Sequence, residues 1–336
     1  MTVYSERLGD ISDAQFAAVV TRAGLGAFRS AAPITTGLFG QNVFLTTTSG
    51  EFVFRGAPHW WKGAPNDAWQ FPKERFYATL MHERTKVPVA HPQILDRCDV
   101  FPWPYLIMPR LPGVCLDDPA QREGLSGRDF AAVAGVMGTN LAAMQRLTNP
   151  FAGDFDPAVG GLIAFEGGYH AHIVSGLTEL AQDSSRSGSW TADDDDWLQI
   201  LIAADRSTPE RTPAVYAHND YALGNVLFQR ATTGWRVSGV IDLMTSCFGD
   251  PAADLVRITC QFLDTAPALA TAFHNAYRAT ASTPPSPPAR LALLTAYERL
   301  AIWTHFSRPP HPSAFTVGTT FRRWAEPYLE QLLTMT

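Results

Sequence analysis

Three polar residues follow an apolar run in the second half of the chain, in the order His218, Asp220 and Asn225. A further acid, Asp242, comes directly after a second apolar run. A carboxylate can orient a hydroxyl group and take its proton, and carboxylate and amide oxygens are the ligands that hard divalent cations prefer. Phosphoryl transfer requires this set of side chains, because the protein mainly supplies metal ligands and positioning for that reaction.

The spacing H-x-D-x-x-x-x-N is expected by chance in roughly one or two chains in a hundred of this length. A predicted strand enters the loop at Val215 and another leaves it after Asn225, and this context makes a chance match less frequent. From the residues alone, the alternative is that His218 and Asn225 cap a buried turn and that Asp242 caps a helix.

The same stretch resembles the aminoglycoside phosphotransferase and choline kinase family, whose members are small-molecule kinases with a protein-kinase-like fold. The resemblance is carried by His218-Asn219-Asp220-Tyr-Ala-Leu-Gly224-Asn225, by Val240-Ile241-Asp242 and by Gly249-Asp250-Pro251-Ala-Ala-Asp254-Leu255. With weaker motifs before them, the matching residues run from 33 to 258, about two thirds of the chain. One departure is Asn219, where many antibiotic kinases of the family carry Gly.

For the catalytic loop, the resemblance implies that Asp220 orients the acceptor hydroxyl and acts as the base. It also implies that Asn225 and Asp242 hold the magnesium ions. Three residues are expected to brace the loop rather than touch substrate: His218, Asp250 and Asp254.

For the donor, the resemblance implies that Arg55 neutralises the phosphates and that Glu74 on the following helix holds Arg55 by an ion pair. The turn over the phosphates is expected at Gly37, Phe39 and Asn42. Backbone groups from Met108 to Arg110 are expected to receive the base of the nucleotide. Because the backbone reads the base there, the donor is either ATP or GTP, with Mg²⁺ as the cofactor.

The expected elements give an α+β chain of two lobes that begins with a short amphipathic helix at 11–24. Short strands at 43–45, 52–55, 93–95 and 105–108 and a helix at 72–84 predict a small antiparallel sheet with one helix, in a nucleotide-binding lobe of residues 1–109. Helices predicted at 130–147, 169–181, 251–260, 266–279 and 290–306 dominate a catalytic and acceptor-binding lobe of residues 110–336. This is the bilobal protein-kinase-like arrangement that the resemblance implies.

Composition limits the partners and the location of the protein. The formal net charge of -6 gives no basic field to collect nucleic acid. No stretch approaches the ~18 to 20 apolar residues of a membrane span, and the first ten residues lack the apolar core of a signal peptide. The four cysteines are scattered and are interpreted as reduced thiols. We therefore expect a cytoplasmic monomer or homodimer.

The acceptor is less closely defined by the sequence. Residues 290–336 hold three acids and five arginines, with aromatic side chains between them: Trp303, His305, Phe306, Phe321 and Trp324. If the aromatic residues line the acceptor site, the acceptor is neutral and aromatic or nucleoside-like, because a polycationic aminoglycoside needs carboxylates. The alternative is that they are core residues. The acidic run Asp193–Asp196 is expected to begin a helix, since carboxylates suit its positive end.

We therefore predict phosphoryl transfer from ATP or GTP to a hydroxyl of a small molecule, which we expect to be an antibiotic. The alternatives are a kinase for a choline- or sugar-like metabolite and a catalytically silent, nucleotide-binding pseudokinase. The presence of Asp220, Asn225 and Asp242 together disfavours the pseudokinase. A protein kinase is disfavoured because the short segment from Asp242 to Gly249 leaves no room for a long activation segment.

Overall fold

The computed structural model describes residues 2–5, 9–34, 41–56, 70–92, 94–96, 100–101, 103–186, 190–307 and 317–335. The chain divides into two compact units. The first comprises Met1–Val114, Asp156–Gly161 and Ser238–Met244, and the second comprises Cys115–Phe155, Leu162–Val237 and Thr245–Thr336. A short segment that follows the catalytic loop in sequence, and that includes Asp242, therefore belongs with the N-terminal residues.

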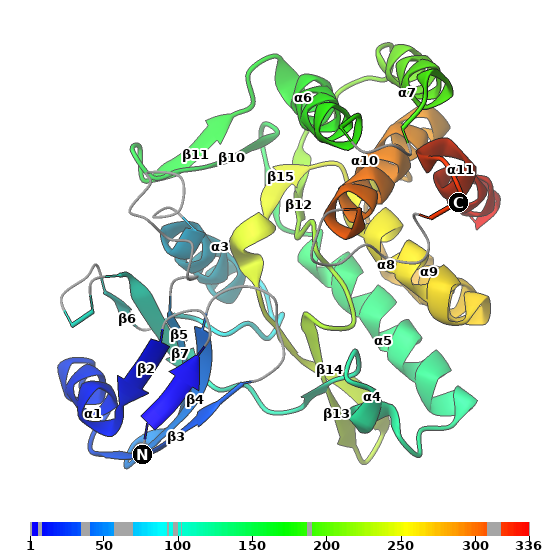
Figure 1. Ribbon diagram of the computed structural model, residues 1–336. Helices are drawn as coiled ribbons and strands as arrows, with labels where there is room; N and C mark the ends of the chain where they lie inside the picture. The colour runs from blue at the N-terminus through cyan, green and yellow to red at the C-terminus, as the bar shows by residue number, and fades with distance from the viewer. Residues whose placement is uncertain are drawn as a thin grey trace. The chain divides into compact units, whose positions relative to one another are not determined.

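The first unit is built on a five-stranded antiparallel sheet in the order β3-β4-β5-β7-β6 (Figure 1). Its strands are β3 (Phe28–Pro33), β4 (Gln41–Thr47), β5 (Gly50–Gly56), β6 (Ile94–Asp96) and β7 (Tyr105–Pro109). A turn at Thr48-Ser49 joins β4 to β5. Strand β3 and the paired strands β1 (Thr2–Ser5) and β2 (Gly9–Ser12) were not predicted.

Alternation along β5 directs its side chains to the two faces of this sheet. Phe52 and Phe54 pack with helix α1 (Asp13–Arg22), where the rings of Phe16 and Phe54 meet edge to face at 5.5 Å. Arg55 points to the other face and meets Glu74 of helix α3 (Gln70–Arg84). The sheet therefore carries a helix on each face. Only the helix at 72–84 was expected on the sheet, although α1 itself matches the helix predicted at 11–24. Arg55 points away from the larger aromatic core.

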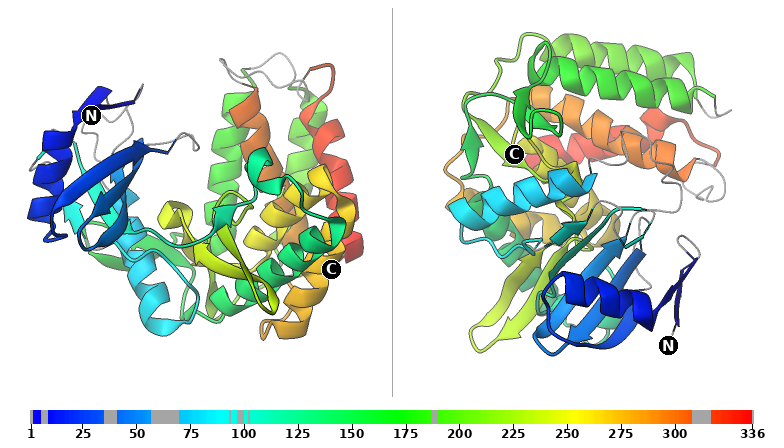
Figure 2. Two further views of the ribbon diagram at one scale, coloured as in Figure 1. Left: turned by 90° about the horizontal axis from the view of Figure 1, so that it is seen from below. Right: turned by 90° about the vertical axis from the view of Figure 1, so that its left-hand side faces the viewer.

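The second unit is mainly helical, and every helix predicted in it is present. The helices are α4 (Pro119–Arg122), α5 (Gly127–Met144), α6 (Gly168–Ser184), α7 (Ala192–Asp205), α8 (Ala252–Thr265), α9 (Pro267–Thr280), α10 (Pro288–Phe306) and α11 (Phe321–Met335). Leu293, Leu300 and Trp303 place α10 in the centre of a core shared with α6, α7, α8 and α11. Helices α6 and α7 contact each other and run side by side in the right-hand view of Figure 2.

Short strands precede and follow the predicted catalytic loop of residues 218–225. One sheet has the order β11-β10-β15-β12-β9, and a second has the order β14-β13-β8. These strands are β8 (Val114–Cys115), β9 (Thr148–Asn149), β10 (Gly153–Asp156), β11 (Gly161–Ala164), β12 (Ala214–Ala217), β13 (Val226–Ala231), β14 (Gly234–Val240) and β15 (Cys247–Gly249). The segment between β12 and β13 holds His218, Asp220 and Asn225. Within the described ranges, no helix is both long and apolar enough to cross a membrane.

Candidate active site

Helix α8 fixes the start of the catalytic loop in the second unit. The backbone N–H groups of His218 and Asn219 each donate to a carboxylate oxygen of Asp254, at 2.8 Å in both cases. Thr245 donates its hydroxyl to the carbonyl of His218 at 2.7 Å. Burial raises the pKa of Asp254 to about 6, while the neighbouring His218 and the two N–H donors oppose that change. Asp254 thus contacts the loop, as predicted for a bracing residue.

His218 and Asp250 contribute to the same region in different ways. The buried ring of His218 accepts the backbone N–H of Asp220 on Nδ1, at 3.3 Å, so this ring lies under the loop. Asp250 instead accepts the N–H of Ala252 at 3.0 Å, at the start of α8, and lies 3.6 Å from Arg211. These contacts of Asp250 stabilise the start of α8, the helix that carries Asp254, and do not involve the loop itself.

Asn219 adopts a left-handed backbone conformation, with φ at 61°. Glycine reaches this region without strain, and Asn is among the side chains that tolerate it best. The side-chain amide of Asn219 donates to the carbonyl of Thr245 at 2.9 Å and to Cys247 Sγ at 3.2 Å. This backbone conformation explains why Asn can stand where many antibiotic kinases carry Gly.

Asp220 and Asn225 face each other across the loop. Nδ2 of Asn225 donates to Asp220 Oδ2 at 2.8 Å and to the Asp220 carbonyl at 2.9 Å. Both partners are acceptors, so the nitrogen of the amide is fixed on this side. Its Oδ1 has no hydrogen-bond partner within the part of the chain that the structure describes. The arrangement presents an amide oxygen that suits a hard divalent cation.

In the first unit, Arg55 joins Glu74 to Asp242. Its Nη1 lies 2.8 and 2.9 Å from the two carboxylate oxygens of Glu74, and its Nη2 lies 2.9 Å from Asp242 Oδ1. Burial alone would lower the pKa of Arg55, but the carboxylates of Asp242 and Glu74 raise it above its ordinary value. Burial has the opposite effect on Glu74: it raises the pKa of this carboxyl group, and the charge of Arg55 opposes that change. The structure therefore brings together three of the predicted donor-side and metal residues.

Two further residues expected on the nucleotide side, Asn42 of β4 and Met108 of β7, belong to the same sheet. Asn42 is the register partner of Arg55 across β4 and β5, and its buried Oδ1 has no hydrogen-bond partner among the described residues. Met108 is buried in β7. Arg110 donates its backbone N–H to the carbonyl of Glu51 at 3.1 Å, so that N–H is already used within the sheet. Gly37 and Phe39 lie outside the described residues.

Comparison with known proteins places this geometry in a family. Residues 30–297 match the family model described as the phosphotransferase enzyme family, which covers well over half of the chain. The chain belongs to this family. An aminoglycoside 3'-phosphotransferase of Streptomyces fradiae is 28% identical to the phosphotransferase over 220 residues, which cover 62% of this chain and 74% of the relative.

Solved structures show that the phosphotransferase has the protein-kinase-like fold predicted. A ternary complex of a thermostable variant of aminoglycoside phosphotransferase APH(4)-Ia with ADP and hygromycin B is similar, with a TM-score of 0.63 and 14% identity over 94% of this chain and 97% of that chain. A GDP complex of aminoglycoside 2'-phosphotransferase-IIIa has a TM-score of 0.62 and 13% identity, with 96% of each chain covered. The α+β fold class is thereby confirmed.

One contact of the predicted catalytic loop was not expected from the sequence of the phosphotransferase. Arg257, on α8, has Nε at 3.0 Å and Nη2 at 2.9 Å from Asp220 Oδ1. Its Nη1 donates to Glu298 Oε1 of α10 at 3.0 Å. The only signal in the sequence is its position three residues after Asp254, which places both side chains on one face of a helix.

Two of the aromatic residues considered for the acceptor site belong to the core. Trp303 and Phe321 are completely buried, with ring centroids 6.0 Å apart. Trp324 packs against the same cluster. For Trp303 and Phe321 the structure therefore favours the core interpretation.

The acidic run Asp193–Asp196 lies in the first turns of α7, where Asp194 completes a capping box with Thr191.

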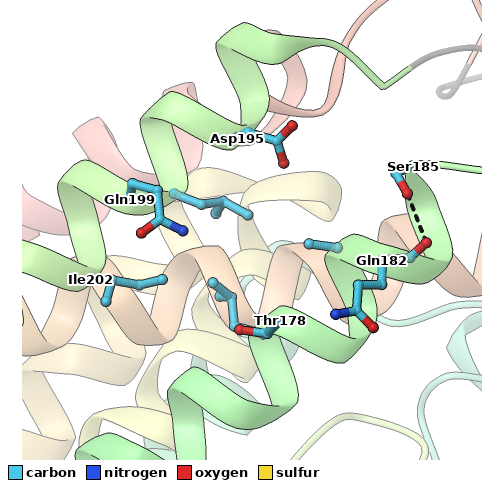
Figure 3. Close-up of a pocket in the computed structure, with 9 residues that line it drawn as sticks. Thr178, Gln182, Ser185, Asp195, Gln199 and Ile202 are labelled. Atoms are coloured by element: carbon cyan, nitrogen blue, oxygen red, sulfur yellow. Dashed lines mark hydrogen bonds between the residues drawn. The ribbon is translucent and has the colours of Figure 1, made fainter.

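A hollow of about 250 Å³ lies between α6 and α7 and is lined by nine residues, including Thr178, Gln182, Asp195 and Gln199 (Figure 3). Its other lining side chains are mostly aliphatic, and none of the nine comes from the catalytic loop or from α8. It is therefore not assigned to the reaction. Among the described residues, no group of three or more His, Cys, Asp or Glu side chains is arranged to hold a metal ion.

Proposed function

We propose that this phosphotransferase moves the γ-phosphoryl group of ATP or GTP to a hydroxyl of a small-molecule antibiotic. The observation that carries the proposal is the geometry of Asp220. Asn225 and Arg257 hold its carboxylate from two sides, and Asp254 holds the backbone on which it stands. With 33% of its side chain exposed, Asp220 can still be reached by an acceptor hydroxyl. A base must be positioned in this way before its proton affinity matters.

In the proposed reaction, Asp220 receives the proton of the acceptor hydroxyl. The acceptor oxygen forms a new bond to the γ-phosphorus, and the bond from that phosphorus to the bridging oxygen of the donor breaks. The electron pair of the broken bond stays on the terminal phosphate of the nucleoside diphosphate. Asp220 then releases its proton to solvent, so the products are a phosphate ester, a nucleoside diphosphate and one proton.

The residues of the donor side fit Mg²⁺ and phosphate. Asn225 presents an amide oxygen and Asp242 a carboxylate. Few protein ligands are needed, because water and the donor phosphates usually complete the coordination shell of Mg²⁺. When bound, Mg²⁺ neutralises charge on the phosphate oxygens. Arg55, held by Glu74, contributes a fixed positive charge and forked N–H donors that suit phosphate. The N–H of Arg110 is already used by Glu51, so we assign the nucleotide base to neighbouring backbone groups around Met108.

The proposal of an antibiotic acceptor is supported by the relatives. The Streptomyces fradiae relative is an aminoglycoside 3'-phosphotransferase, and one neighbouring structure holds hygromycin B. The burial of Trp303 and Phe321 removes much of the support for a neutral, aromatic or nucleoside-like acceptor. We therefore propose an aminoglycoside-type antibiotic as the first acceptor to test and a nucleoside-type antibiotic as the second.

A turnover assay with Mg²⁺ and either ATP or GTP tests this function over a panel of aminoglycosides, hygromycin B, nucleoside antibiotics, choline and simple sugars. We expect nucleoside diphosphate release that depends on one antibiotic and a mass increase of ~80 Da on that compound. Transfer to choline or a sugar alone would make the protein a metabolite kinase. Nucleotide binding without transfer to any compound would favour a pseudokinase.

The role of Asp220 is tested by Asp220→Asn, which should lower kcat by a factor of about 10² to 10⁴ while nucleotide binding persists. Asp183→Asn is a matched control, because Asp183 lies on α6 in an exposed ion pair with Arg186. This control should keep full activity. Full transfer activity in Asp220→Asn would show that the proposed mechanism is wrong.

A further inference from the structure

Two side chains on one face of helix α8 contact the proposed catalytic loop. Asp254, in its first turn, accepts two backbone N–H groups of the loop. Arg257 lies three residues later, and side chains at this spacing are neighbours on a helix surface. Its guanidinium meets the Asp220 side chain of the same loop. One helix face therefore fixes both the backbone of the loop and its carboxylate.

The carboxylate of Asp220 is held on both oxygens. Oδ1 receives Nε and Nη2 of Arg257 at 3.0 and 2.9 Å, and Oδ2 receives Nδ2 of Asn225 at 2.8 Å. Rotation of the carboxylate would break contacts on both sides at once. Charge-assisted bonds from a guanidinium are both strong and directional, so Arg257 defines the side-chain orientation more strongly than Asn225 can.

Arg257 is itself held from α10. Its Nη1 donates to Glu298 at 3.0 Å, and only 11% of the Glu298 side chain is exposed. Glu298 also accepts from Arg299, whose guanidinium lies against the rings of Tyr328 at 4.6 Å and Trp324 at 5.2 Å. Burial would lower the pKa of Arg257, but Asp220 and Glu298 raise it, which keeps the group charged. Positive and negative groups thus alternate from Asp220 to the aromatic surface of α11.

We infer that Arg257 is a positioning residue for phosphoryl transfer: it holds Asp220 toward the acceptor hydroxyl, and Glu298 holds Arg257 in place. This inference rests on the proposed function, in which Asp220 is the base. A partly exposed ion pair contributes little to stability, whereas a displacement of about 1 Å in a reacting group can cost about 10² in rate. Loss of Arg257 should therefore reduce kcat far more than it reduces stability.

The experiment compares Arg257→Gln, Arg257→Lys, Arg257→Ala and Glu298→Gln in the full chain with the accepted antibiotic. We expect Arg257→Gln to lower kcat by a factor of about 10 to 100, with the KM for nucleotide within about twofold. Arg257→Lys should recover part of kcat, because an ammonium keeps the charge but not the fork. Glu298→Gln should lower kcat in the same sense by a smaller factor. Low, non-denaturing concentrations of guanidinium chloride should raise the activity of Arg257→Ala, and sodium chloride at equal ionic strength should not.

Arg322→Gln is the matched control, because it also removes a partly exposed arginine from ion pairs, in this case with Glu326 and Asp193. It should leave kcat unchanged. A kcat for Arg257→Gln within twofold of the unsubstituted protein, with Asp220→Asn inactive, would overturn this inference alone. Full activity in Asp220→Asn would instead overturn the proposed function. If the neutral variants at 257 do not fold, Arg257→Lys and Glu298→Gln decide: a lower kcat at unchanged thermal midpoint supports the role, and unchanged kcat in both refutes it.

Discussion

Asn219 shows how one backbone angle selects a residue type beside the proposed base. With φ at 61°, the position would strain a β-branched residue, whereas it accepts Gly or Asn with little strain. Asn adds hydrogen bonds to Thr245 and Cys247, which Gly lacks. The choice of Asn therefore exchanges the conformational freedom of Gly for a side chain that ties the loop to the segment before β15.

Substitution at this position should separate backbone strain from lost hydrogen bonds. Asn219→Gly should cost about 1 kcal/mol of unfolding free energy and keep most of the activity, because only hydrogen bonds are lost. Asn219→Val should cost about 2 kcal/mol more and lower kcat, because its backbone is strained in this region. Urea unfolding and steady-state kinetics measure both effects. Equal stability of the two variants would show that the left-handed angle does not constrain the residue.

Single residues also show what the sequence can and cannot predict. Asp220 and Asn225 contact each other and lie in one sequence motif. Arg55 and Glu74 also contact each other, and the order of a strand followed by a helix already identifies them as a pair. Arg257 and Glu298 belong to no motif. The role of Arg257 follows from its contacts with Asp220, 37 positions earlier in the chain, and with Glu298, 41 positions later. The local sequence around an arginine in a helix does not distinguish an arginine of a surface ion pair from one that contacts a catalytic base.

At the scale of elements, α5 and α9 pack closely because α5 carries glycine at the crossing. A Cβ atom on Gly138 would lie 2.3 Å from the carbonyl oxygen of Phe273 and 2.9 Å from the nitrogen of Tyr277. A Cβ atom on Gly135, one turn earlier, would meet only the methyl group of Ala276 at 4.0 Å. The two glycines thus have opposite expected roles in one helix.

We expect Gly138→Ala to destabilise the protein by about 2 kcal/mol or more, since backbone atoms must move apart to admit a methyl group. Gly135→Ala should instead stabilise by about 0.5 to 1 kcal/mol, the difference between the two residues in a helix. Thermal or urea unfolding of the two variants provides the comparison. A destabilising Gly135→Ala would mean that the helices approach more closely there than the structure indicates.

The contact between α8 and α9 should make stability depend on acid. His274 is buried and shares a 2.8 Å hydrogen bond with Thr259, and burial, aided by Arg278, lowers its pKa to about 4. Between that pH and about 6.5 the unfolded chain holds a proton that the folded protein gives up. The contribution of His274 is therefore complete above pH 6.5 and is lost as pH falls through about 4, by up to about 3 kcal/mol.

The measurement is the free energy of unfolding of the protein and of His274→Gln at pH 7 and at pH 4.5. The substituted protein should lose less stability between these two values, because Gln does not titrate. Parallel losses in both proteins would assign the acid sensitivity to other groups.

The elements predicted from sequence are those with a clear apolar period. Strands β4, β5 and β7 and helix α5 alternate or repeat in the expected way, and each is present. Strand β3 was missed because Ala31 is its only buried residue, so its sequence shows no alternation. Strands β10 and β11, for which no strand was predicted, are likewise short and mostly exposed or half-buried. Their strand structure depends on pairing partners rather than on local pattern.

At the scale of the whole molecule, the unit to which Asp242 belongs is not the one that its position in sequence suggests. Residues Ser238–Met244 belong to the first unit, where Val240 donates its N–H to Pro88 at 2.8 Å and Asp242 meets Arg55. Asp220 and Asn225 belong to the second unit. Position in the sequence alone therefore does not assign Asp242 to a unit.

The proposed donor and magnesium residues predict that nucleotide and magnesium stabilise the protein together. At a nucleotide concentration of 100 times Kd with Mg²⁺, the free energy of unfolding should rise by about 2.7 kcal/mol, visible as a higher thermal midpoint. Chelation of Mg²⁺ should remove most of that increase. Asp242→Asn keeps an oxygen for Arg55 but loses the charge, so its midpoint should respond weakly to Mg²⁺. An equal shift with and without Mg²⁺ would contradict the assignment of these ligands.

The shared carboxylate of Glu298 has a consequence for how this sequence could have diverged. Arg257 and Arg299 both donate to it, so it lies between two guanidinium groups. A lineage that lost the acid at 298 while keeping both arginines would bring two like charges together with less compensation. Among relatives that share this arrangement, we expect the absence of an acid at this position to coincide with the absence of at least one of the two arginines. Aligned homologous sequences can reveal that covariation without any assay.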